Sequence, residues 1–141
     1  MKLLLAVDGS ACSDHAVAHV IASLDRWREA PELHLLHVHP PIPVGRVQQF
    51  VSQDSLERYY RDESAAQLAS AERLLAAAGV ACTRHIHVGP AAEVIVRVAE
   101  ELGCAEIVLG NLGRSALAEA VLGSVAHAVL CRATLPVLLV K

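Results

Sequence analysis

Aromatic residues are scarce in this chain of 141 residues, and so is positive charge. Phe, Trp and Tyr make up only 3% of the sequence, which argues against the stacking surfaces that bind single-stranded nucleic acid. Twelve Lys and Arg against 15 Asp and Glu give a formal net charge of −3, whereas a general nucleic-acid binder carries a basic face. The composition therefore predicts that nucleic acid is not a partner.

Long hydrophobic runs and paired cysteines are also missing. The apolar run at residues 3–7 is interrupted by Asp8, and the uncharged stretch 120–131 is too short to cross a bilayer. The cysteines are scattered and form no C-x-x-C pair, so we expect free thiols in a reducing compartment. They stand at Cys12, Cys82, Cys104 and Cys131. These absences predict a cytoplasmic protein with no membrane partner.

The chain is rich in apolar residues, with 54% hydrophobic against 19% charged. A chain of this length buries about two-thirds of the surface that its unfolded form exposes. Because one domain typically takes about 150 residues, residues 1–141 are predicted to form a single globular domain.

Short apolar runs alternate with segments of helical periodicity along the whole sequence. Such alternation is typical of a parallel sheet with helices on both faces. Strands are predicted at 3–7, 33–38, 80–88, 106–109 and 136–140. Helices are predicted after Ser10 or Ser13 as N-cap, at about 55–78, from Pro90 as first residue to Gly103, and at 124–132, with a loop at 44–54.

Glycines and polar residues gather after the first and fourth predicted strands. Asp8-Gly9-Ser10 follows the first strand, Gly110-Asn111-Leu112-Gly113 follows the fourth, and Gly123-Ser124 opens the last helix. Ligands of open parallel sheets bind beyond the carboxyl ends of the strands, and a helix N-terminus favours an anion. The pattern indicates a phosphate-bearing ligand, although each glycine alone is also explained as a turn or cap residue. Walker A and G-x-G-x-x-G sequences are absent.

The spacing Gly110-x-x-Gly113, nine residues, Gly123-Ser124 matches the G-2x-G-9x-G-[ST] nucleotide loop of the universal stress protein family. The chain resembles this family throughout, in the opening LLLAVDGS, the segments HLLHVH and VGPAAEVI, and the closing LGSVAHAVL and LPVLLVK. The resemblance implies a Rossmann-like fold of the adenine nucleotide alpha hydrolase type. Its open five-stranded parallel sheet has the order 3-2-1-4-5, which would bring the two glycine-containing strand ends together.

The resemblance also implies a binding site for ATP or AMP, because the chain keeps the complete loop of the ATP-binding branch. Ala6, Val7 and Asp8 would line the pocket. Asp8 would lie near the ribose or a nucleotide-bound magnesium ion, and Val38 would meet the adenine through its backbone.

The sugar and the phosphates would lie against the loop. Leu109 and Gly110 would lie under the sugar. Where many relatives place a His or Arg between the loop glycines, this chain has Leu112, and Arg114 is the expected replacement cation. The residues that would hold the phosphates are Gly113, Gly123, Ser124 and Val125.

Eight histidines and several serines prompt two further hypotheses. His37-x-His39 and His85-x-His87 each place two imidazoles on one strand face. A zinc site needs three or four converging ligands, so ordinary strand and rim positions explain these histidines better. No Ser, His and Asp follow a catalytic spacing, and one Asp with one Arg is a poor set of groups for phosphoryl transfer. We predict neither a catalytic residue nor a protein-held metal site.

The last predicted strand, with Val137 to Val140 apolar on both faces, lies at the sheet edge in the inferred order. An apolar edge promotes aggregation unless something pairs with it, and the resemblance implies a homodimer through this strand. The expected function is a regulatory module of the stress response, in which ATP orders the loop 110–123 and changes a surface presented to another, unidentified protein. Two alternatives stand beside it: a slow ATPase, and a dimeric interaction protein that binds no nucleotide.

Overall fold

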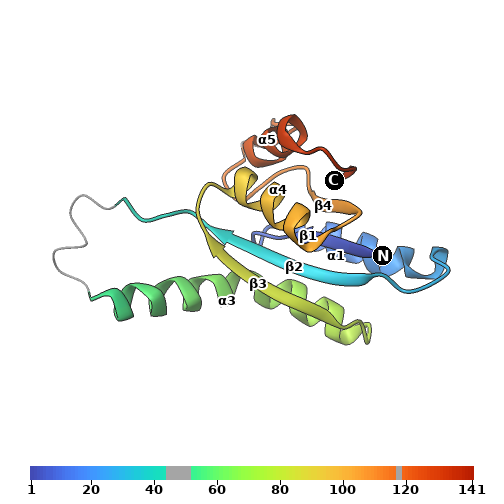
Figure 1. The fold of residues 1–141 in the computed structure, drawn as a ribbon, viewed down its shortest axis with the longest axis horizontal. Coiled ribbons are helices and arrows are strands. Elements are labelled where there is room, and N and C mark those ends of the chain that lie inside the picture. Colours follow the sequence, from blue (N-terminus) through green and yellow to red (C-terminus); the bar gives the residue numbers. More distant parts are fainter. Residues whose placement is uncertain (44–51, 117–118) are drawn as a thin grey trace.

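The computed structural model describes residues 1–43, 52–116 and 119–141, in which strands and helices alternate (Figure 1). The five strands are parallel and lie in the order β3-β2-β1-β4-β5. The predicted fold class and strand order are therefore confirmed. In chain order the elements are β1 (Lys2–Ala6), α1 (Ala11–Ser23), the short 3-10 helix η1 (Leu24–Arg26), β2 (Glu32–His39), α3 (Gln53–Ala77), β3 (Cys82–Val88), α4 (Ala91–Leu102), β4 (Glu106–Gly110), α5 (Ser124–Arg132) and β5 (Val137–Val140).

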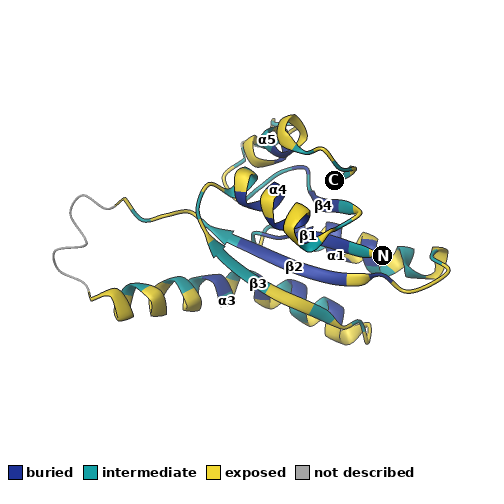
Figure 2. Ribbon diagram, in the orientation of Figure 1, coloured by how far each residue is buried: buried dark blue, intermediate teal, exposed yellow. Residues whose placement is uncertain are grey.

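Helices cover both faces of the sheet, and β1 and β2 are buried over most of their length (Figure 2). Side chains of a strand point alternately to the two faces. Leu3 and Leu5 of β1 belong to the core under α1 and α3, whereas Leu4 belongs to the core under α4 and α5. Burial on both sides explains why the first strand is a continuous apolar run.

Several element boundaries differ by one or two residues from the prediction, and helix capping explains two of them. α3 begins at Gln53 because the Ser52 hydroxyl accepts a backbone N–H of the first turn and so caps the helix. Pro90 was predicted as the first helical residue of α4, but in the structure it is the N-cap of this helix. Of the predicted loop 44–54, residues 44–51 lie outside the described residues.

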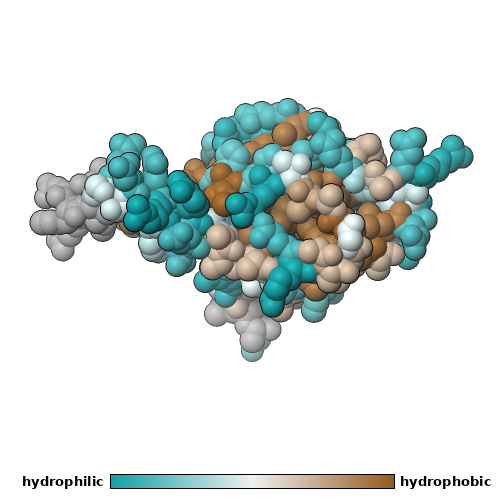
Figure 3. Space-filling view, turned by 90° about the horizontal axis from the view of Figure 1, so that it is seen from below, coloured by the Kyte–Doolittle hydropathy of each residue, from teal (hydrophilic) through white to brown (hydrophobic). Residues whose placement is uncertain are grey.

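α3 is long and projects beyond the sheet at its N-terminal end (Figure 1). Its 25 residues correspond to a length of about 37 Å, and its buried positions begin only at Ser64. Figure 3 shows polar residues gathered on the projecting end and apolar areas on the body of the molecule. The C-terminal part of α3 is therefore the part anchored on the sheet. No helix in the described ranges combines the length and apolar character needed to cross a bilayer.

Candidate functional site

A cavity of about 700 Å³ lies beyond the carboxyl ends of β1 and β4, where the strand order reverses. Its volume is in the range of small-molecule sites. Among the lining residues that were not predicted for the site are five with polar or charged side chains: Ser13, His37, His39, Glu63 and Gln67. Every residue that the sequence predicted for the site lines this cavity, namely Ala6, Val7, Asp8, Val38, Leu109, Gly110, Gly113, Arg114, Gly123, Ser124 and Val125.

Asp8 joins the loop after β1 to the loop after β4. Its Oδ1 accepts hydrogen bonds from the Ser10 N–H at 3.0 Å and the Ser13 hydroxyl at 2.7 Å, and its Oδ2 accepts from the Arg114 N–H at 3.0 Å. A Cβ on Gly113 would lie 3.0 Å from the same Oδ2. A carboxylate has about four acceptor positions, so a nucleotide-bound magnesium ion would find at most about one of them free. In this arrangement Asp8 acts mainly as a clamp between the loops.

The hydrogen bonds also fix the charge of Asp8. Burial acts to raise the pKa of this carboxyl, but the hydrogen bonds from Ser10, Ser13 and the Arg114 backbone together outweigh burial and hold the pKa below its ordinary value. The side chain is therefore ionised at neutral pH. Because the folded-state pKa is the lower one, Asp8 stabilises the fold above about pH 4, and this stabilisation is lost as the pH falls through the folded value.

Two of the loop glycines are required by close contacts within the protein. A Cβ on Gly110 would lie 2.7 Å from the carbonyl carbon of Cys12, in the first turn of α1. A Cβ on Gly123 would lie 3.2 Å from the carbonyl oxygen of Asn111. Neither glycine has a positive φ. The absence of a side chain at these positions is thus explained by the approach of α1 and of the loop itself, before any ligand is considered.

Asn111, which the sequence analysis did not single out, holds the loop after β4 closed. Its side-chain amide donates to the Val121 carbonyl at 2.8 Å, and its own carbonyl accepts from the Gly123 N–H at 2.7 Å. Its backbone N–H donates to the Val140 carbonyl at 2.8 Å, which ties the loop to β5. Its position as a polar residue directly after a buried strand is the sequence feature that could have identified Asn111. Asn111 brings the start of α5 beside the end of β4.

No side chain caps the N-terminus of α5, whose N-cap is Gly123. The first residues of a helix carry backbone N–H groups without intrahelical partners, and here those residues, Ser124, Val125 and Ala126, all line the cavity. The helix dipole adds positive potential at this end, and the Ser124 hydroxyl is a further donor. This set of donors fits a phosphate group.

His37 is a neutral member of the cavity wall. It is 5% exposed, and its Nδ1 lies 2.8 Å from the Val7 carbonyl oxygen, to which it donates. Burial lowers the pKa of His37, against the opposing effect of the Val7 hydrogen bond. Among the cavity-lining residues that the structure describes, Arg114 is therefore the one fixed positive charge, whereas Asp8 and Glu63 contribute carboxylates.

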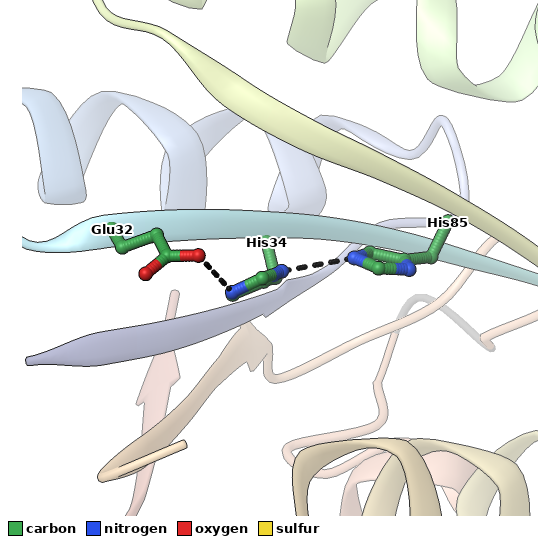
Figure 4. Close-up of polar contacts among 3 residues, drawn as sticks. All are labelled: Glu32, His34 and His85. Carbon is green, nitrogen blue, oxygen red and sulfur yellow. Dashed lines mark hydrogen bonds and ion pairs between the residues drawn. The ribbon is translucent and has the colours of Figure 1, made fainter. Parts of the chain in front are cut away.

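Two other histidines, which do not line the cavity, join β2 to β3. His34 Nδ1 lies 2.9 Å from His85 Nε2, and His34 Nε2 lies 3.1 Å from Glu32 Oε1 (Figure 4). The pairing crosses the two strands, whereas the sequence hypothesis paired histidines along one strand. Within the described ranges no three His, Cys, Asp or Glu side chains converge as a metal site would require.

We expect the stability of the protein to fall as the pH is lowered from 7 to 5. Burial lowers the pKa of His37 and of His85 from the ordinary 6.5, so the unfolded chain binds more protons below that pH. The stabilisation is complete above about pH 6.5 and is lost as the pH falls through the folded values. Urea denaturation at pH 7, 6 and 5 measures the slope.

The matched variants are His37→Asn, which keeps a donor near Nδ1 but does not titrate, and His19→Asn at an exposed position of α1. The first should flatten the dependence of stability on pH, and the second should leave it as in the wild type. An unchanged slope in His37→Asn would show that this ring does not contribute.

The fold and the cavity define a class of protein: a doubly wound, Rossmann-like α/β protein with a cavity at the point where its strand order reverses. A family model described as the universal stress protein family matches residues 1–141. The chain belongs to the universal stress protein family.

Solved structures of similar fold extend over nearly the whole chain. The protein is 31% identical to the hypothetical protein MJ0577, with a TM-score of 0.83 over 99% of this chain and 94% of that one. A universal stress protein in complex with cAMP is 24% identical, with a TM-score of 0.71 over 100% and 97%. A universal stress protein family protein from Arabidopsis thaliana with AMP bound is 19% identical, with a TM-score of 0.65 over 100% and 91%. A search of curated protein sequences gave no significant match.

Proposed function

We propose that the protein binds an adenine nucleotide, ATP or AMP, in the cavity at the strand reversal. The observation that carries this proposal is the convergence on one cavity of the uncapped N-terminus of α5, the Ser124 hydroxyl and the Arg114 side chain. Phosphates would accept from the first-turn N–H groups and from Ser124, with Arg114 as counter-charge. Gly123 keeps this end of the helix clear of any side chain.

The remainder of the cavity suits a nucleoside. Apolar side chains of three elements line it: Leu36 and Val38 on β2, Ile95 on α4 and Leu109 on β4. A planar base would bury its faces against such side chains, and the backbone of Val38 would supply the polar contacts to its edge. Together with the phosphate donors, these walls favour a nucleotide over inorganic phosphate.

Two of the comparisons support this proposal. Proteins of the same fold were solved with cAMP and with AMP. At 24% and 19% identity those likenesses establish the shared fold, so the ligand is inferred from the donors and walls of this cavity.

Binding is expected to act as a signal, in a cytoplasmic regulatory module of the stress response. The nucleotide would contact the loop that runs from Gly110 to Gly123, and Asn111 of that loop is hydrogen-bonded to Val140 of β5. A change in the loop on binding would therefore reach the edge strand and the surface offered to a partner. Slow ATP hydrolysis is the weaker alternative, because the hydrogen bonds that Asp8 accepts make it a poor base.

The proposal includes a homodimer formed through β5. This strand pairs with β4 and with no other strand that the structure describes, and its four residues are apolar and half-buried. In the segment that precedes β5 along the chain, the apolar side chains of Val121, Val125 and Leu130 are exposed. A second copy pairing with this edge would cover the strand.

The experiment that tests nucleotide binding starts from freshly purified protein. Heat denaturation should release ATP or AMP in near-stoichiometric amount, identified by chromatography and mass spectrometry. Ser124→Ala removes one donor to phosphate and should weaken nucleotide binding about three- to tenfold in a calorimetric titration. Ser55→Ala, an exposed serine of α3, is the matched control. An empty supernatant together with no thermal shift at millimolar ATP or AMP would favour the interaction protein that binds no nucleotide.

A further inference from the structure

Gln67, on the cavity side of α3, contacts both loops that form the site. Its side-chain nitrogen donates to the Asp8 carbonyl oxygen at 3.0 Å, and its side-chain oxygen accepts from Arg114 Nη1 at 2.9 Å. The two partners fix this orientation of the amide, because a carbonyl oxygen only accepts and a guanidinium only donates. The contact joins α3 to residues far away in the sequence.

The turn of α3 that carries Gln67 is held firmly against the rest of the molecule. Leu68 and Ser64 on the same helix are fully buried. Gly9, with φ +78°, packs directly on Gln67, and a Cβ there would lie 3.3 Å from the Gln67 Cα and closer still to the end of its side-chain amide. The amide therefore has a fixed place from which it contacts Arg114.

Arg114 is consequently held at two points. Its backbone N–H donates to Asp8 Oδ2, and its guanidinium donates to Gln67. An arginine side chain loses rotamer entropy when a ligand immobilises it, and a contact already made in the ligand-free protein reduces that loss. Because the amide oxygen is neutral, it orients the guanidinium without cancelling its charge. Most of the guanidinium's five N–H donors stay available for an anion.

We propose that Gln67 is a positioning residue that keeps the Arg114 guanidinium at the cavity as the cation for the ligand's phosphate. The inference rests on the proposed nucleotide binding and adds a residue outside the glycine loop to it. Arg114 is the one fixed cation among the described lining residues, whereas Asp8 and Glu63 bring negative charge. Phosphate affinity should therefore depend on where that single cation is held.

The test compares adenosine with AMP, because only AMP carries the group that Arg114 would bind. The affinity for AMP divided by the affinity for adenosine, measured by NMR or calorimetric titration, reports the phosphate contribution. Gln67→Met keeps the length of the side chain but removes the amide, and it should lower this ratio about three- to tenfold. Gln67→Glu should lower it further, since a carboxylate would neutralise the guanidinium. The affinity for adenosine should stay the same in both variants.

Three comparisons separate positioning from a merely structural role. Gln53→Met, at an exposed position of the same helix, should leave the ratio unchanged. In an Arg114→Met background, Gln67→Met should have no further effect, because the two residues act as one unit. Thermal unfolding checks that each variant is folded.

An unchanged ratio in Gln67→Met, an equal loss for adenosine and AMP, or additive effects in the double variant would each overturn the inference while leaving the proposed function standing. A wild-type protein that binds none of adenosine, AMP and ATP would overturn the proposed function, and this inference with it.

Discussion

Replacing Gly110 with alanine should lower the free energy of unfolding by about 3 kcal/mol, whether or not a nucleotide is bound. The added Cβ would lie 2.7 Å from the carbonyl carbon and the Cβ of Cys12 and 2.9 Å from its carbonyl oxygen. Two of these are backbone atoms in the first turn of α1, so no change of side-chain rotamer relieves the contact. Either α1 or the end of β4 has to move. Urea denaturation of the ligand-free protein measures the loss.

The matched control is Gly79→Ala, where a Cβ meets no atom within 4 Å. Gly79 has φ +70°, so its replacement costs only the left-handed backbone strain of about 1–2 kcal/mol. If Gly110→Ala costs no more than Gly79→Ala, close packing against α1 is not the reason for glycine at position 110. A ligand-contact role alone would instead leave the stability unchanged and remove only nucleotide binding.

The fold could be predicted from the sequence because burial of a strand on both faces leaves a strong local pattern of apolar residues. Strands buried on both sides appear as uninterrupted apolar runs, as at Leu3–Leu5. The Ser10 cap of α1 and the start of α5 at Ser124 were predicted. The start of α3 was not, because the Ser52 cap acts through one side-chain hydrogen bond and lies outside the apolar pattern. The strand order came from the family resemblance, since no local pattern states which strands are neighbours.

The candidate site could be predicted from the sequence only in part. The polar residues and glycines at the strand ends were found because ligands of open parallel sheets bind there. The other predicted lining residues came from the family resemblance. Gln67 and His37 were missed because a glutamine on a helix or a histidine on a strand has no local mark of the distant residue that it contacts. Asn111 stood between the loop glycines, where the motif leaves the residue type open. Gly110 was predicted as a site residue, but the close approach of Cys12, which leaves no room for a side chain there, was not predicted.

In the proposed homodimer, Leu139→Pro should convert the dimer to a monomer. The Pro136 carbonyl accepts a hydrogen bond from the Ile107 N–H of β4, and the Val140 carbonyl accepts one from the N–H of Asn111, directly after β4. Backbone groups in a parallel ladder alternate between the two sides of a strand, so Val137 and Leu139 direct their N–H and C=O groups toward the open edge. A proline at position 139 removes an outward N–H and obstructs a second strand, while it spares the hydrogen bonds to β4. Light scattering at micromolar concentration measures the mass.

Leu139→Ala is the variant that separates strand pairing from side-chain packing. Leu139 packs against the core under α4 and α5, so both replacements lose that contact, but alanine keeps the outward N–H. If backbone pairing across the edge holds the two copies together, the alanine variant should stay dimeric at a concentration where the proline variant is monomeric. If both variants are monomeric, apolar side chains and not the strand edge carry the interface. A wild-type protein that is already monomeric would remove β5 from the proposal and leave the cavity as the only functional surface argued from this fold.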